Sequence, residues 1–277
     1  MPFAARIAAG GLVFLFTFVS GGSACTLKRG ETVAVAQIVD GGELRLADGR
    51  AVKLQGIEMP HPAGPTTPAW PLAEEARAFL SALAAREGLS LKTGKPKTDR
   101  YGRALTFLIL ADGDSIQRRL VEAGLARVRS TRDARSCIRD LLAVESAARA
   151  ARRGIWAEPF YAVRHAQDVA ALEDLEGSFQ IVEGRVRDVS TVSGRVYLNF
   201  GDDWRKDFTV TVGRSDVKLF KPGGDGVGDL AALKGRDVRV RGFVERFNGP
   251  KMTVTFPEEI ELLGPETAKA NGKARVR

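Results

Sequence analysis

The sequence has few of the residues that bind transition metals. It contains two histidines, His61 and His165, and two cysteines, Cys25 and Cys137. Neither a CxxC nor an HExxH pattern occurs. A protein zinc site needs three or four such ligands held close together. A zinc enzyme is therefore not expected.

The sequence also lacks an apolar run long enough to span a bilayer. Its clearest run, residues 7–19, has 13 residues, whereas a transmembrane helix needs about 20. Arg6 precedes this run and the small residues 20–24 follow it. This pattern is typical of an export signal over residues 1–24 that is cleaved before Cys25. We therefore expect an exported protein, either periplasmic or secreted.

Cys25 and Cys137 leave several alternatives open. In an oxidising compartment they can pair and tie the mature N-terminus to a helix. Alternatively, Cys25 is a free or lipid-anchored terminal thiol and Cys137 is a small buried apolar side chain. Gly22 stands where lipoprotein signals usually have leucine. The sequence supports pairing and non-pairing about equally.

Positive charge is concentrated in the first part of the chain. The formal net charge is +8. Residues 25–173 carry 23 basic and 18 acidic side chains, whereas residues 174–264 carry 14 and 15. A nucleic acid bound by electrostatic attraction is therefore expected on the first part. A merely solvated basic surface is the alternative.

The alternation of apolar residues and the turn signals predict two β-rich units. Asp40-Gly41 and Asp48-Gly49 are hairpin signals, and four prolines in residues 61–71 predict a loop. In the first unit we expect strands at 32–37, 43–46, 50–54, 89–93 and 105–110 and helices at 72–87, 116–124 and 133–153. In the second we expect five short strands between residues 177 and 256 and a helical turn at 228–233.

Three short segments resemble the motifs of one enzyme family. Residues 40–43 read Asp-Gly-Gly-Glu, residues 53–61 read Lys-Leu-Gln-Gly-Ile-Glu-Met-Pro-His, and residues 99–103 read Asp-Arg-Tyr-Gly-Arg. Over residues 32–159 the chain thereby resembles the staphylococcal-nuclease-like (thermonuclease) family. The resemblance implies an OB-type barrel decorated with helices. It also implies calcium-dependent phosphodiester cleavage, with two aspartates on the metal, a glutamate as general base and two arginines on the phosphate.

The fold class that follows is mainly β with helices (α+β). It comprises an N-terminal SNase-like OB-fold barrel with three helices and a second small OB-like β-barrel. The predicted boundaries are a signal peptide at 1–24, a thermonuclease-like domain at 25–159, a linker at 160–173, an OB-like domain at 174–264 and a disordered tail at 265–277.

Several positions that carry the family's chemistry are replaced in this sequence. Gly42 stands where the family has its first metal-binding aspartate, and Glu58 stands at the second. Lys53 takes the place of the first phosphate-binding arginine and keeps the charge without the planar two-point grip. His61 occupies the general-base position, and Arg103 matches the second arginine. We expect no cofactor, because the calcium ligand set is incomplete.

Basic residues surround the best-kept motif. The predicted nucleic-acid contacts are Lys53, Lys95, Lys97, Arg100, Tyr101 and Arg103. A second basic run follows further on, and it either lines a phosphate backbone or forms solvated helix faces: Arg127, Arg129, Arg132, Arg135 and Arg139. In the second unit, six aromatic residues either stack on bases or form the core: Tyr197, Phe200, Trp204, Phe208, Phe243 and Phe247.

Three functions are compatible with this sequence. The first is a catalytically degenerate nuclease fold that binds nucleic acid or another polyanion. The second is a weak phosphodiesterase with a rewired site made of Glu58, His61 and Arg103. The third is an envelope protein-interaction module whose partner the sequence does not identify.

Overall fold

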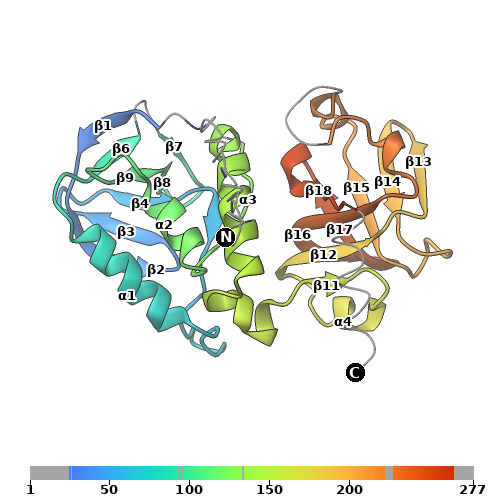
Figure 1. Ribbon diagram of the computed structural model, residues 1–277, viewed down its shortest axis with the longest axis horizontal. Helices are drawn as coiled ribbons and strands as arrows, with labels where there is room; N and C mark the ends of the chain where they lie inside the picture. Colours follow the sequence, from blue (N-terminus) through green and yellow to red (C-terminus); the bar gives the residue numbers. More distant parts are fainter. Residues whose placement is uncertain are drawn as a thin grey trace, which may run out of the picture.

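The computed structural model describes residues 25, 27–92, 94, 96–132, 134–221 and 227–264 (Figure 1). The predicted export signal and C-terminal tail lie outside these residues. The chain is mainly β with few helices, as predicted, and its buried apolar residues form two clusters. Among the described residues, no helix has the length and apolar character required to cross a membrane.

The first unit is built from short strands. Its largest sheet has the order β2-β3-β4-β8-β7, a second has the order β1-β6-β9, and β5 pairs with β10. These strands are β1 (Arg29–Thr32), β2 (Val35–Asp40), β3 (Glu43–Leu46), β4 (Ala51–Leu54), β5 (Ile57–Glu58), β6 (Ser90–Lys92), β7 (Lys97–Thr98), β8 (Ala104–Thr106), β9 (Leu108–Ile109) and β10 (Arg127–Val128).

A two-residue turn sets the register between the first two strands of the largest sheet. Gly41 and Gly42, both with positive φ, connect β2 to β3. This is the two-residue geometry that glycine permits and that matches the twist of paired strands. The register then places Glu43 opposite Lys53 on β4, and β4 runs parallel to β8. This parallel register places Lys53 beside Leu105, so the residues that precede β8 lie at the same end of the sheet as the start of β4.

Three helices pack on the first unit: α1 (Ala73–Ala84), α2 (Ile116–Glu122) and α3 (Arg135–Ala150). Ser115 caps α2 by accepting a hydrogen bond from the Arg118 amide at 3.1 Å. The buried face of α1 carries Ala76, Leu80 and Leu83, which are part of the helical spacing that the sequence predicted. These side chains complete the first apolar core together with residues of β3, β4 and β8–β9.

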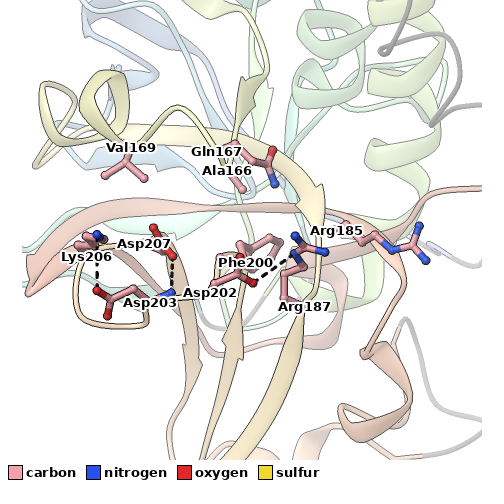
Figure 2. Close-up of a pocket in the computed structure, with 11 residues that line it drawn as sticks. Ala166, Gln167, Val169, Arg185, Arg187, Phe200, Asp202, Asp203, Lys206 and Asp207 are labelled. Atoms are coloured by element: carbon pink, nitrogen blue, oxygen red, sulfur yellow. Dashed lines mark hydrogen bonds and ion pairs between the residues drawn. The ribbon is translucent and has the colours of Figure 1, made fainter.

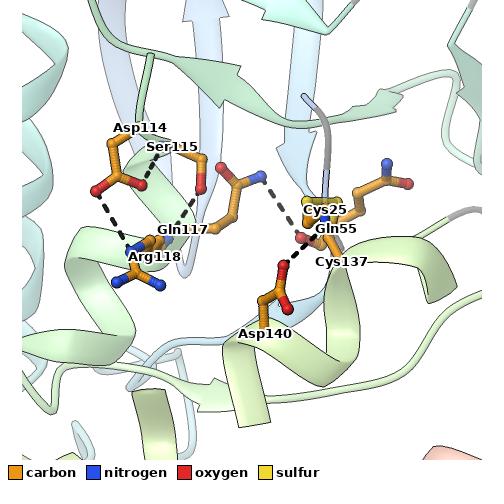
Figure 3. The surroundings of a disulfide bond; sticks show 8 residues. All are labelled: Cys25, Gln55, Asp114, Ser115, Gln117, Arg118, Cys137 and Asp140. Carbon is orange, nitrogen blue, oxygen red and sulfur yellow. Dashed lines mark hydrogen bonds and ion pairs between the residues drawn. A yellow bond between two sulfur atoms is a disulfide. The ribbon is translucent and has the colours of Figure 1, made fainter. Parts of the chain in front are cut away.

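A disulfide between Cys25 and Cys137 joins positions 112 residues apart (Figure 3). It fastens the start of the described chain to α3. The backbone N–H of Cys25 also donates to Asp140 Oδ2 at 2.8 Å. Of the alternatives that the sequence left open, the structure therefore contains the paired form.

The second unit is one eight-stranded sheet that curls into a half-barrel (Figure 1). Its order is β11-β12-β16-β17-β15-β14-β13, with β18 also paired to β16. The strands are β11 (Arg164–His165), β12 (Phe179–Arg185), β13 (Asp188–Val192), β14 (Arg195–Asn199), β15 (Thr209–Val212), β16 (Asp237–Phe247), β17 (Gly249–Val254) and β18 (Ile260–Leu262), and the helix α4 (Val169–Glu173) lies between β11 and β12.

Three of these strands are absent from the five that the sequence pattern predicted. Strand β13 escapes prediction because Asp188, Ser190 and Thr191 leave it without a clear apolar alternation. The structure forms it because Ser193 and Gly194, both with positive φ, close a tight hairpin onto β14. Strands β11 and β18 have two and three residues, which is too short for any periodicity.

The two units are joined by charged side chains that are removed from water. Arg241 of β16 and Glu145 of α3 are 1% and 0% exposed. Arg241 donates to Glu145 Oε2 at 2.8 Å and to the Val128 carbonyl at 2.9 Å. Figure 1 shows α3 on the side of the first unit that faces the second sheet. A buried charge needs its partner, so these contacts hold the two units in one arrangement.

Candidate functional site

The segment 99–103 forms a turn that its own aspartate closes. Asp99 Oδ1 accepts hydrogen bonds from the amides of Tyr101 at 2.9 Å and Arg103 at 3.0 Å. The Asp99 amide in turn donates to the Arg103 carbonyl at 3.0 Å, and Gly102 has a positive φ. The Asp-x-Tyr-Gly-Arg pattern thus has a local structural reason, because the Asp99 carboxylate and backbone bind the backbone groups that close the turn.

Two carboxylates hold the Arg103 guanidinium. Its Nη1 lies 2.5 Å from Glu43 Oε2, and its Nη2 lies 2.6 Å from Asp99 Oδ2. Burial would lower the pKa of Arg103, but the hydrogen bonds to Asp99 and Glu43 outweigh it and raise that pKa. A phosphate that approaches Arg103 must therefore compete with Glu43 for the same nitrogen atoms.

Tyr101 projects from this turn into solvent, with its side chain 66% exposed. The guanidinium carbons of Arg100 and Arg103 lie 4.8 Å and 5.0 Å from its ring centroid. Lys97 of β7 is also exposed and lies on the neighbouring strand. We call Lys97, Arg100, Tyr101 and Arg103 the tyrosine patch. An exposed aromatic ring flanked by cations is suited to hold a base and its phosphate.

Lys53 lies beside the Gly41-Gly42 turn. Its Nζ donates to the Gly41 carbonyl at 2.6 Å, so the charge that replaces an arginine is directed at the backbone. A Cβ added at Gly42 would lie 3.5 Å from Met59 Sδ and 3.6 Å from Leu54 Cβ. Gly42, where the resemblance implies a metal-binding aspartate, therefore faces apolar side chains.

Glu58 is enclosed between two cationic or ionisable side chains. Its Oε2 lies 3.7 Å from Arg127 Nη2 and its Oε1 lies 3.7 Å from His61 Nε2. Burial favours a raised pKa of Glu58, but the neighbouring His61 and the charges of Arg127 and Arg129 lower it. Glu58 is therefore ionised at neutral pH and already paired.

His61 is packed as well as paired. Its ring meets the Trp70 ring edge-on, with centroids 4.6 Å apart, and the Trp70 amide donates to the His61 carbonyl at 2.9 Å. A Cβ on Gly41 would lie 3.0 Å from His61 Nδ1. The proline-rich segment thus folds back and places His61 between Glu58 and the Gly41-Gly42 turn.

Arg127 is a residue of this site that the sequence reasoning did not assign to it. It is 3% exposed, and burial lowers its pKa although Glu58 opposes the shift. The rings of Trp70, Tyr161 and Phe179 lie 5.1–5.8 Å from its guanidinium carbon. Phe179 belongs to β12, so the second unit contributes one wall around the residue that neutralises Glu58.

The interpretation of the second basic run as solvated helix faces is wrong for three of its members. Arg127 is buried, Arg129 lies 4.8 Å from the Phe243 ring, and Arg135 pairs with Glu258 at 2.8 Å. These arginines face the second unit, and Arg127 is flanked by apolar residues at 125, 126 and 128. An arginine inside an apolar stretch is the signal that could have been noticed.

These residues do not fit a calcium ion. Calcium takes about six to eight oxygen ligands, and no group of three or more His, Cys, Asp or Glu side chains in the described part of the chain is arranged to hold a metal. Glu58 Oε2 has no hydrogen-bond partner there, but the charge nearest to it is the Arg127 guanidinium. A cation stands where further anionic ligands would be required.

Of the other predicted site residues, Lys95 lies outside the described residues. The aromatic residues of the second unit divide into two groups. Phe200 and Phe208 are buried in its core, whereas Trp204 and Phe247 are more than half exposed. Arg205 lies 4.6 Å from the Trp204 ring, and Lys251 lies 5.6 Å from the Phe247 ring. Of these six side chains, only Trp204, Phe247 and the partly exposed Phe243 and Tyr197 are accessible enough to stack on a base.

A cavity of about 480 Å³ lies in the second unit beside β11 and α4 (Figure 2). Arg185 and Arg187 come to it from the end of β12, and Asp202 and Asp203 come from the loop after β14. Arg187 is 3.9 Å from Asp202, and Lys206 is 3.7 Å from Asp203. Its charges are largely matched within the cavity, so it shows no preference for an anion or a cation.

Comparison with known proteins gives a match to the first unit. Residues 51–158 match the family described as Staphylococcal nuclease homologue. A thermonuclease of Staphylococcus intermedius is 28% identical over 125 residues, which cover 43% of this chain and 74% of that protein. A thermonuclease of Staphylococcus hyicus is 29% identical over 102 residues, which cover 36% of this chain and 60% of that protein. Residues 159–264 lie beyond the family match.

Proposed function

Because residues 51–158 form a staphylococcal-nuclease-like domain, we propose that this protein binds nucleic acid through the tyrosine patch and does not cleave it with calcium. The observation that carries the proposal is the state of Glu58. Its carboxylate is paired with Arg127 and His61, and apolar side chains face Gly42. The tyrosine patch thus keeps a surface suited to nucleic acid, whereas Glu58 and Gly42 do not offer calcium the ligands that it requires.

The exposed ring of Tyr101 supports binding to a single strand. Stacking of a base on an aromatic ring contributes about 1–3 kcal/mol and tolerates any base. Arg100 and Arg103 beside the ring add attraction for the phosphates. Because Glu43 and Asp99 neutralise part of this charge, the binding is modest in affinity and sensitive to salt.

A rewired phosphodiesterase is the second candidate, and one observation favours it. His61 Nε2 lies 3.7 Å from Glu58 Oε1, so a carboxylate orients an imidazole that is partly open to solvent. An imidazole can take a proton from water near neutral pH. Against it, the guanidinium that would stabilise the transition state is already held by two carboxylates.

We further propose that residues 174–264 form an OB-like module and that the protein is exported. The curled sheet of β12–β18 supports the first point, and the pattern of residues 1–24 supports the second. A protein partner in the cell envelope is the remaining alternative for this module.

Salt titration of binding tests the proposed function. Fluorescence anisotropy of labelled single-stranded DNA is followed with the full mature chain as salt is raised. About three phosphate contacts predict a slope of log K against log salt near −2. Arg103→Ala and Tyr101→Ala should each weaken binding, whereas Arg77→Ala, a change of an exposed cation on α1, should not. An affinity that does not change with salt, or that Arg77→Ala lowers as much as Arg103→Ala does, would overturn the proposal. Protein partners would then be the function to test.

A further inference from the structure

Two bonds hold Cys25, the first described residue. Its sulfur is bonded to Cys137, and its backbone nitrogen lies 2.8 Å from Asp140 Oδ2. Figure 3 shows both partners on the same end of α3, with the Asp140 carboxylate directed at the Cys25 nitrogen. A backbone amide at the edge of the fold does not require a carboxylate as its acceptor. A charged amino terminus, in contrast, would interact with the full negative charge of a carboxylate.

We propose that export processing makes Cys25 the amino terminus of the mature protein and that Asp140 binds its α-ammonium group. With an export peptidase as catalyst, water cleaves the peptide bond between Ala24 and Cys25. The cleavage leaves a carboxylate on Ala24 and an ammonium on Cys25. Gly22 and Ala24 are the small side chains that such a cleavage site requires.

The ammonium gains more from Asp140 than the amide does. An amide offers one neutral donor, whereas an ammonium offers three donors and a full charge, and charge-assisted hydrogen bonds are about twice as strong. Asp140 is half-buried, so the pair is shielded from part of the solvent screening. The carboxylate that accepts the Cys25 N–H in this structure would thus also accept the charge that processing creates.

The other charged groups nearby come from α2 and the loop before it, from α3 and from the segment that follows α3. They line a cavity of about 900 Å³ next to the disulfide and comprise Asp114, Arg118, Glu122, Arg139 and Arg153. Asp114 lies 3.1 Å from Arg119, and Glu122 lies 3.8 Å from Arg119. These two carboxylates contact an arginine of α2, whereas Asp140 accepts a hydrogen bond from the backbone nitrogen of Cys25.

The disulfide also determines what cannot be attached at Cys25. A lipid anchor would need the Cys25 sulfur as a thioether, but that sulfur is bonded to Cys137. Forming the disulfide removes two hydrogens from the two thiols, and a disulfide-bearing oxidoreductase of an oxidising compartment accepts them. The mature terminus is therefore a non-acylated cystine.

Mass spectrometry of the exported protein tests the processing site. The full chain is expressed in a bacterium that exports it, and the intact mass is measured before and after reduction. The expected mass is that of residues 25–277 less two hydrogens, and reduction should add those two hydrogens. A different first residue, or the added mass of acyl chains on Cys25, would overturn the proposal.

Titration of the α-amino group tests the role of Asp140. In the mature protein its pKa should lie above the usual value of about 7.7–8.0, and Asp140→Asn should lower it by about one unit. The matched control Glu122→Gln removes the same charge from the same cavity and should leave this pKa unchanged. Because the folded pKa is raised, the stabilisation is present below about pH 8 and is lost as the pH rises through the folded value.

Two results would overturn the Asp140 assignment. One is a terminal amine with an ordinary pKa that Asp140→Asn does not alter. The other is an equal change in Glu122→Gln. Asp140→Glu keeps the charge and should restore most of the raised pKa. This variant therefore distinguishes the loss of the charge from a folding defect in Asp140→Asn. A carboxylate that merely packed the helix would not alter the pKa of the amine.

Discussion

Removing the carboxylate that competes for Arg103 should strengthen nucleic-acid binding. Glu43 Oε2 lies 2.5 Å from Arg103 Nη1, so a bound phosphate must share or displace it. The change Glu43→Gln keeps the size of the side chain and an acceptor oxygen but removes the negative charge. Arg103 then has Asp99 as its remaining carboxylate among the contacts described above.

The magnitude follows from Coulomb's law. With a phosphate about 6 Å from the Glu43 carboxylate, the repulsion that is removed is about 0.7 kcal/mol at a dielectric constant of about 80 and about 2.8 kcal/mol at about 20. The side chains of Arg103 and Glu43 are 22% and 19% exposed, which places the site between these limits. We therefore expect affinity to rise by roughly 3-fold to 100-fold.

Anisotropy with labelled single-stranded DNA at low salt measures this gain. Glu74→Gln, which removes an exposed charge on α1, is the matched control for the change in net charge. The gain should disappear in the double variant Glu43→Gln with Arg103→Ala. An unchanged affinity in Glu43→Gln, or an equal gain in Glu74→Gln, would refute the idea that Glu43 restrains Arg103.

Four further predictions concern binding and stability. Tyr101→Ala should weaken DNA binding by about 1–3 kcal/mol and leave Tm unchanged, because the ring is exposed; a lowered Tm would contradict this. Burial raises the pKa of Glu259 to about 7. As the pH rises, the Glu259 carboxyl therefore loses its proton at a lower pH in the unfolded chain than in the folded protein. The free energy of unfolding falls for this reason between about pH 4.5 and 7. Urea unfolding at about pH 8 should therefore show Glu259→Gln more stable by about 2–3 kcal/mol, and no gain would contradict the raised pKa. Glu145→Gln removes one of the two carboxylates that pair with the buried Arg241, Glu261 being the other, and should cost about 1.5–3 kcal/mol in the same assay, whereas an unchanged stability would show that Glu261 alone compensates Arg241. Cys137→Ser should cost about 2–5 kcal/mol, and an excess of reductant should reproduce that loss in the parent chain but not in the variant.

The segments that local chemistry determines could be predicted from the sequence. Strand β3 was predicted with the bounds that the structure gives it, because glycine turns flank it on both sides. Helix α1 followed from the spacing of Ala76, Leu80 and Leu83. In each case the determining residues are neighbours in the sequence.

The pairings that define the candidate site could not be predicted in this way. Glu58 and Arg127 lie in two-residue strands that pair antiparallel, and neither strand carries a periodic pattern. The contact of Glu43 with Arg103 depends on the parallel pairing of β4 with β8. The burial of Arg127 depends on Phe179 of the second unit. These are long-range consequences of packing, which local patterns do not contain.

The most direct test of the central claim is incubation of the mature protein with end-labelled single-stranded DNA and calcium, followed by native and denaturing gels. We predict DNA that is retained but intact, with the same retention when a chelator replaces calcium. Arg103→Ala should reduce that retention. Cleavage above background that both the chelator and Arg103→Ala abolish would contradict the account, because it would show that the Glu58 site still supports metal-dependent chemistry.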